Sequence, residues 1–167
     1  MNADALRALY TYHFKLYRRV WDCIDHLTDE QFVAPVDYSI GSVRNHMVHL
    51  ATVEHRWLAR VAGSPLPDRL RYEDYPTRAA ARAKSDEVEA HFKSFLDGLT
   101  DADLDRPITY TVWRVEGPVT NTMWEILIHV VNHGTDHRAQ VLPILHRLGA
   151  PTLEQDLILY LLEQSSN

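Results

Sequence analysis

Three histidines spaced four residues apart, His129, His133 and His137, are the residues whose type and spacing could perform chemistry in this sequence. An α-helix turns by about 100° per residue, so side chains four apart advance by only about 40° and follow one side of the helix. A neutral imidazole nitrogen is the commonest protein ligand for zinc and similar ions. The spacing therefore indicates a metal site on this helix.

Apolar residues at three- and four-residue spacing indicate which side of this helix faces the core. They are Met123, Ile126, Leu127, Val130, Val141, Ile144, Leu145 and Leu148. His137 lies near the middle of this stripe and His133 about 60° from it, whereas His129 lies about 100° away, at the border. We therefore expect His133 and His137 to point into the protein. They do not form a zincin motif, because Gly134 stands where that motif has its glutamate.

Inward histidines have a second interpretation, in which they are core residues whose nitrogens are satisfied by neighbouring polar groups. A metal site would need a third ligand from elsewhere. In the helix predicted over residues 42–63, His46 lies close to the apolar face and His49 at its edge, so periodicity leaves the choice between them open. His13 falls within the apolar stripe of the first helix, where it either belongs to the core or lines a pocket.

Helical periodicity predicts the elements that position these side chains. Long helices are expected over residues 3–27, 42–63, 77–99 and 120–148, and a short last helix is expected from Thr152, with Leu153, Leu157, Tyr160 and Leu161 packed inward. Residues 64–77 hold three prolines and predict a loop over one end of a bundle. Residues 107–120 partly alternate with period two, which predicts a short hairpin or an extended loop.

Length and composition favour one domain, residues 1–167, with 46% hydrophobic residues to form its core. The net charge of -6 is spread along the chain without a basic block, so nucleic-acid binding is not expected, and arginines such as Arg69, Arg71, Arg78 and Arg82 are interpreted as solvated. The single cysteine, Cys23, and the lack of a signal-like or membrane-spanning apolar run predict a cytoplasmic protein without a membrane partner.

Two segments together resemble the DinB/YfiT family of helical-bundle metalloproteins, which is related to thiol-dependent S-transferases. They are SVRNHMVHLATVEHRW, and HVVNHGTDHRAQVLPILHRLG followed by Asp156 and Tyr160. The family's lone histidine in the second helix falls on His49, and its HxxxH pair falls on His133 and His137. The resemblance thus implies that His49, His133 and His137 bind one divalent ion per chain, zinc or nickel. Where many members read HRGQ, this chain has Ala139 in place of the glycine.

The resemblance also implies an all-α four-helix bundle in up-down-down-up order with an additional short C-terminal helix, and a homodimer. For function it implies a metal-dependent enzyme that activates a thiol or water, acting as a thiol S-transferase or hydrolase on a small molecule, with a low-molecular-weight thiol as possible co-substrate. No catalytic side chain is assigned, because the activated water or thiol would itself be the nucleophile. Asp136, Arg138 and Tyr12 could orient ligands or substrate.

Two other functions remain open at this point. The metal could be structural or sensory in a stress-response protein without turnover, and a fourth protein ligand, His46 or His129, would favour that interpretation. Alternatively, the histidines bind no metal and the bundle serves only to bind a partner.

Overall fold

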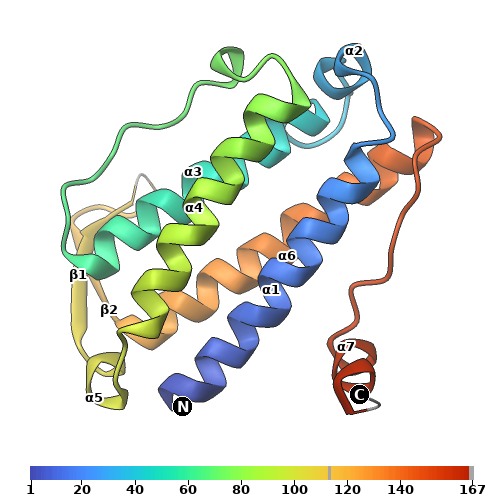
Figure 1. Ribbon diagram of the computed structural model, residues 1–167. Helices are drawn as coiled ribbons and strands as arrows, with labels where there is room; N and C mark the ends of the chain where they lie inside the picture. Colours follow the sequence, from blue (N-terminus) through green and yellow to red (C-terminus); the bar gives the residue numbers. More distant parts are fainter. Residues whose placement is uncertain (113, 166–167) are drawn as a thin grey trace.

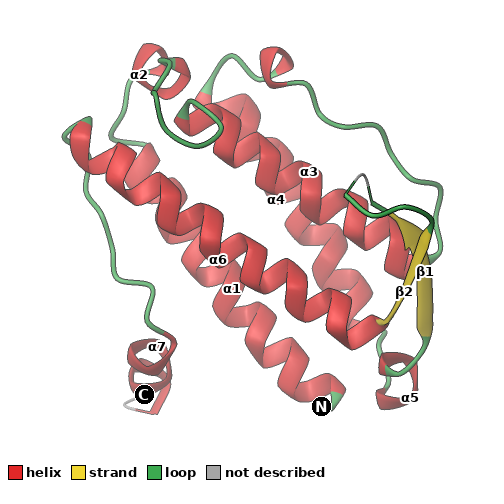
Figure 2. Ribbon diagram, turned by 180° about the vertical axis from the view of Figure 1, so that it is seen from behind, coloured by secondary structure: helices red, strands yellow, loops and turns green. Residues whose placement is uncertain are grey.

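Four long helices form the frame of the protein, whose computed structural model describes residues 1–112 and 114–165. They are α1 (Ala3–Ile24), α3 (Val43–Ala62), α4 (Arg78–Asp97) and α6 (Met123–Arg147). Helices α4 and α6 each pack against both α1 and α3, so the four are arranged as a bundle (Figure 1 and Figure 2). The predicted all-α bundle is confirmed.

Side chains at the helix ends explain where α3 and α6 begin. Ser42 Oγ accepts a hydrogen bond from the backbone N–H of Asn45 over 3.1 Å, as expected of an N-cap. At α6, Thr122 and Glu125 form a capping box, in which the Thr122 N–H donates to Glu125 Oε2 over 2.8 Å. Helix α3 ends at Gly63, whose φ of 69° is a left-handed conformation that glycine adopts without a steric penalty.

The space between the helices is filled by large apolar side chains. The most deeply buried of them include Tyr10, Phe14, Tyr17, Trp21, Phe32, Met47 and Phe92. Burying side chains of this size stabilises the fold by roughly 1.5–3 kcal/mol each. None of the helices in the described part of the chain is both long enough and apolar enough to cross a membrane.

The chain runs up along α1, down along α3, down again along α4 and up along α6 (Figure 1). Because α3 and α4 are neighbours that run in the same direction, the segment that connects the end of α3 to the start of α4 must return along the length of the bundle. Residues 63–77 make this return and include a 3₁₀ turn, η1 (Tyr72–Asp74). The prediction that this segment crosses one end of the bundle is therefore wrong: it runs along its length.

Three smaller elements complete the ends of the bundle. They are α2 (Asp29–Val33), α5 (Asp101–Leu104) and an antiparallel hairpin of β1 (Pro107–Thr111) and β2 (Pro118–Thr122). The hairpin alternative predicted for this segment is the one that the structure contains. It leads directly into α6, and the Tyr110 hydroxyl on β1 donates to Asn121 Oδ1 on β2 over 2.8 Å.

The C-terminal helix α7 (Leu157–Ser165) differs from its prediction in both start and packing. It begins at Leu157 instead of near Thr152, and it meets the bundle only at its edge, through side-chain contacts of Tyr160 and Glu163 with α1 (Figure 1). Leu157 and Leu161, which were expected to pack inward, are 40% and 47% exposed. Two of the predicted contacts are confirmed: the Tyr160 ring lies 5.3 Å from that of Tyr12 on α1, and Leu153, which precedes the helix, packs against the core.

Candidate metal centre

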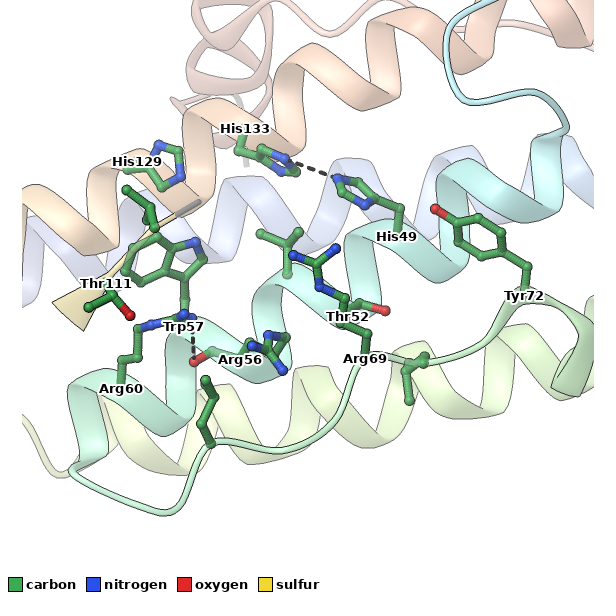
Figure 3. Close-up of a pocket in the computed structure, with 14 residues that line it drawn as sticks. His49, Thr52, Arg56, Trp57, Arg60, Arg69, Tyr72, Thr111, His129 and His133 are labelled. Atoms are coloured by element: carbon green, nitrogen blue, oxygen red, sulfur yellow. Dashed lines mark hydrogen bonds between the residues drawn. The ribbon is translucent and has the colours of Figure 1, made fainter. Parts of the chain in front are cut away.

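Helices α3 and α6 bring His49, His133 and His137 together. One ring nitrogen from each residue lies within 4.8 Å of the other two, so the three could hold a metal ion. His133 and His137 stand one turn apart on α6, and His49 faces them from α3, as the dashed contact in Figure 3 shows for His133. The three residues predicted as ligands are thus adjacent in space.

The separation of one pair of these nitrogens suits a tetrahedral ion. His49 Nε2 and His133 Nε2 are 3.3 Å apart. Two imidazole nitrogens bound to zinc at 2.0–2.1 Å with a tetrahedral angle would be separated by about 3.3–3.4 Å. The side chains therefore fit such an ion without a change in the distance between these two nitrogens.

His46, the alternative third ligand, lies behind the cluster. It is fully buried, and its Nδ1 is 3.3 Å from Nδ1 of His137. A hydrogen bond between these two nitrogens leaves Nε2 of His137 as the atom available to a metal. His46 therefore has the geometry of a residue that orients a ligand, a role commonly taken by the hydrogen-bond partner of a metal-binding histidine.

The environment keeps these imidazoles neutral. Burial, followed by the proximity of His137 and Arg69, lowers the pKa of His49 to about 4. Burial and the neighbouring histidines lower the pKa of His133 to about 3, and burial lowers that of His137, against the opposing effect of Asp136. Because only a neutral imidazole can donate a lone pair to a metal, protons do not compete for these ligands at neutral pH.

His129, the first histidine of the series, belongs to the wall of a neighbouring cavity. Its ring is 5.8 Å from that of His133 and packs edge-on against Trp57 at 5.4 Å. The cavity has a volume of about 420 Å³ and is bounded by α3, α6, the returning segment and the end of β1. His49 and His133 also line it, so the histidine cluster opens into this cavity (Figure 3).

A buried polar network holds α6 in place next to the cluster. Arg138 Nη1 donates to His13 Nδ1 over 3.0 Å, and His13 Nε2 is 2.9 Å from Glu54 Oε1. All three side chains are almost completely buried. Burial lowers the pKa of His13, so the neutral ring accepts from the guanidinium and donates to the carboxylate. Gly134 makes room for this ring, since a Cβ there would lie 2.3 Å from His13 Cε1.

The other polar candidates near the histidines have structural partners. Arg138 Nε also donates to Gln155 Oε1 over 2.8 Å, and the Tyr12 hydroxyl donates to the Gln155 backbone oxygen. Both therefore fix the segment before α7. Asp136 is exposed and accepts a hydrogen bond from Gln140 Nε2 over 3.0 Å.

Sequence reasoning did not identify Glu54 as a partner of His13. The signal was present, because Glu54 follows Leu50 by four residues and precedes Leu58 by four, which places a carboxylate within the apolar stripe of α3. A charge in such a stripe indicates a buried partner. The partner itself lies 41 residues away on α1, and no local pattern identifies it.

Comparisons with known proteins agree with this architecture. A protein of Bacillus subtilis described as Protein DinB is 23% identical over 168 residues, which cover 95% of each chain. A DinB-like protein of Bacillus cereus has a TM-score of 0.71 at 18% identity and covers 92% of this chain and 98% of its own. A conserved protein of Enterococcus faecalis has a TM-score of 0.67 at 17% identity, and the match covers 84% of this chain and 94% of that protein. The DinB family model matches residues 1–165, and the chain therefore belongs to the DinB family.

Proposed function

We propose that this protein binds one divalent ion, zinc or nickel, through His49, His133 and His137, and uses it to activate a thiol or water towards a small molecule in the adjacent cavity. The observation that carries the proposal is that the three imidazoles have nitrogens within 4.8 Å of one another, and that two of them, His49 and His133, line a cavity of about 420 Å³. A structural site would more commonly be closed by a fourth protein ligand.

Neither candidate for a fourth ligand belongs to the cluster of described residues whose ring nitrogens lie within 4.8 Å of one another. His46 lies behind His137, and the His129 ring packs against Trp57. Three protein ligands with an open position are typical of catalytic zinc sites. This arrangement favours the enzyme over a stress-response protein with a purely structural metal.

A divalent ion held by three neutral imidazoles would keep its full charge and lower the pKa of a water or thiol towards neutrality. The chain's own residues provide the setting for that chemistry. His46 orients His137, and the hydrogen bonds among Arg138, His13 and Glu54 fix the rotation of α6. Trp57 stands between the hairpin and His129, where it supplies an apolar wall to the cavity.

Metal content and affinity test the site. Protein purified without a histidine tag should contain about one equivalent of ion, measured by elemental analysis. Replacing His49, His133 or His137 by alanine should abolish tight binding, because two imidazoles hold an ion far less well than three. His46→Ala is the matched control and should weaken binding by only about 10–100-fold, as expected for a residue that orients a ligand. Loss of metal in His46→Ala with retention in His49→Ala would reverse the assignment.

Turnover is tested separately with the metal-loaded protein. Glutathione and other low-molecular-weight thiols, each combined with a chromogenic aryl halide or a hydrolysable ester, should reveal transfer or hydrolysis that His133→Ala lacks. Stoichiometric metal without turnover across a broad panel would instead support the stress-response alternative. Protein that binds no divalent ion would leave only the association of the bundle with a partner.

Homodimerisation is part of the proposal and is supported by the surface of α7. Leu157, Ile158, Leu159 and Leu161 are between 40% and 56% exposed on one short helix. A second copy of the chain that covered them would remove this apolar area from water. Sedimentation at micromolar concentration should therefore show a dimer, and Ile158→Glu should shift it towards monomer. A wild-type monomer under these conditions would contradict the proposal.

We also propose a cytoplasmic location and no nucleic-acid or membrane partner. The free, buried thiol of Cys23 is compatible with a reducing compartment. Fractionation of cells that express the protein from its own gene tests the location, and its recovery with the membrane fraction would count against it.

A further inference from the structure

Among the described residues, the lining of the cavity beside the histidines includes three arginines and no carboxylate. Arg56 and Arg60 stand one turn apart on α3, and Arg69 enters from the returning segment on the other side. Figure 3 shows Arg60 near Thr111 and the Arg69 side chain extending from its loop towards the histidines. The chain as a whole carries a net charge of -6, so the positive charge at this cavity is opposite in sign to the net charge of the protein.

The contacts of these arginines leave donors available. Arg56 Nη1 donates to the backbone oxygen of Pro67, which anchors the returning segment. Arg60 lies 4.7 Å over the Trp57 ring and makes one long hydrogen bond, 3.4 Å, to the Arg56 backbone oxygen. Among the described residues, the Arg69 guanidinium has neither a hydrogen bond nor an ion pair, and its charge helps to lower the pKa of His49.

Some arginines outside the cavity are instead paired with carboxylates. Arg78 contacts Asp29 at 2.8 Å, and Arg82 contacts Asp22 and Asp25. Arg69 was grouped with these residues as a solvated arginine; it is exposed, as expected, and it also lines the cavity. Burial, followed by repulsion from Arg56, lowers the pKa of Arg60, as expected of two neighbouring guanidinium groups at a cavity whose described lining contains no carboxylate. A cluster of this kind is a ready site for an anion, because guanidinium groups form strong paired hydrogen bonds with oxyanions.

We propose that Arg60 and Arg69 bind the oxyanion, a carboxylate or a phosphate, of a small molecule whose apolar body packs on the Trp57 side of the cavity. The volume of about 420 Å³ is within the range of small-molecule sites. This inference names the substrate class for the proposed function and rests on it for the reaction. Binding of the anion itself depends on the arginines and is measurable without metal.

Calorimetric titrations with three probes test the assignment. Cinnamate and phenyl phosphate carry the two oxyanions on an aromatic body, and cinnamamide is the neutral counterpart of the first. At low ionic strength, at least one anion should bind metal-free protein about tenfold or more tightly than cinnamamide, since a hydrogen-bonded charge commonly contributes that much. Whichever anion binds more tightly identifies the oxyanion that the site prefers.

Variants locate the site. Arg69→Gln and Arg60→Gln should each weaken anion binding about tenfold and leave cinnamamide binding unchanged. Arg71→Gln is the matched control, because Arg71 is an exposed arginine of the same segment that does not line the cavity. Circular dichroism verifies that each variant is folded, and Arg69, on an exposed stretch of the loop, is the substitution least able to disturb the bundle.

The inference is overturned if neither anion binds more tightly than the amide, or if Arg71→Gln weakens binding as much as Arg69→Gln. It is also overturned if anions bind only zinc-loaded protein and are insensitive to both arginine substitutions, because the ion would then be their sole partner. If the protein binds anions but no metal, this inference stands and the proposed function is refuted.

Discussion

Replacing Gly134 by alanine tests whether the close approach of α6 to α1 holds the bundle together. In a helix interior this change normally stabilises by up to about 1 kcal/mol, because alanine has the higher helix propensity. Here the added Cβ would lie 2.3 Å from His13 Cε1 and 3.1 Å from Arg138 Nη1. Carbon atoms in contact are normally about 3.5–4.0 Å apart, so the ring or the helix must move by more than an ångström.

The cost follows from what that movement breaks. His13 is held by hydrogen bonds of 3.0 Å to Arg138 and 2.9 Å to Glu54, and each of the three side chains is almost inaccessible to solvent. Breaking a buried charged contact by displacing one partner costs about 3–5 kcal/mol. Subtracting the gain of about 1 kcal/mol in helix propensity leaves a net destabilisation of about 2–4 kcal/mol.

Urea denaturation of metal-free protein, followed by circular dichroism, measures this loss as a lower transition midpoint. Gly98→Ala is the matched control: Gly98 has an ordinary helical φ of -83°, and its Cβ would lie 3.6 Å from the nearest atom, the Phe95 oxygen. That variant should be neutral or slightly more stable. The double variant His13→Ala/Gly134→Ala should lose less stability than the sum of the losses of the two single variants, and the difference should be at least about 1 kcal/mol. A Gly134→Ala protein as stable as the parent would refute the reasoning.

Three further predictions concern pH, metal and the start of α6. The stability of metal-free protein should be greatest above about pH 6.5 and fall as the pH is lowered towards 4. In the folded state the pKa values of His46, His49 and His133 are lowered to about 4, 4 and 3. In that pH range the unfolded chain therefore binds protons at these histidines that the folded protein does not bind. A midpoint in urea that is unchanged between pH 8 and 5 would contradict those shifts. Zinc at 100 times its dissociation constant should stabilise the folded state by about 2.7 kcal/mol, seen as a higher melting temperature that a chelator reverses. Glu125→Ala, which removes the carboxylate of the capping box, should cost about 1 kcal/mol in the same urea assay, and an unchanged midpoint would show that the cap is dispensable.

The inward placement of the HxxxH pair could be predicted from the sequence because both histidines lie on one helix. The apolar stripe of that helix has a direction, and His133 and His137 could be placed against it without knowledge of the other helices. The choice between His46 and His49 could not be made in that way, because it depends on the rotation of α3 relative to α6. His49 faces the groove shared by the two helices, whereas His46, nearer the apolar centre of α3, lies behind His137. Only the resemblance to the family selected His49.

Errors in the prediction of the fold have a similar origin. The residues of α7 have the composition of a helix, but periodicity gives no information on whether a surface is available to receive Leu157 and Leu161. The direction of α4 relative to α3 was available from the family and not from the residues. Contacts among His13, Glu54 and Arg138 join three helices across 41 and 125 residues of chain, so they lie beyond the range of any local pattern.

The parallel arrangement of α3 and α4 has a consequence for how members of such a fold could diverge. A chain that must travel back along its own bundle needs a long connecting segment, and here that segment contributes Leu66, Arg69, Leu70 and Tyr72 to the cavity. The histidines stand on two helices whose rotation is fixed by the core, whereas the returning segment is largely exposed. Exchanging residues 64–76 between relatives would thus change the lining of the cavity while leaving the three histidines in place, so under the proposed function this segment is the place to redesign selectivity.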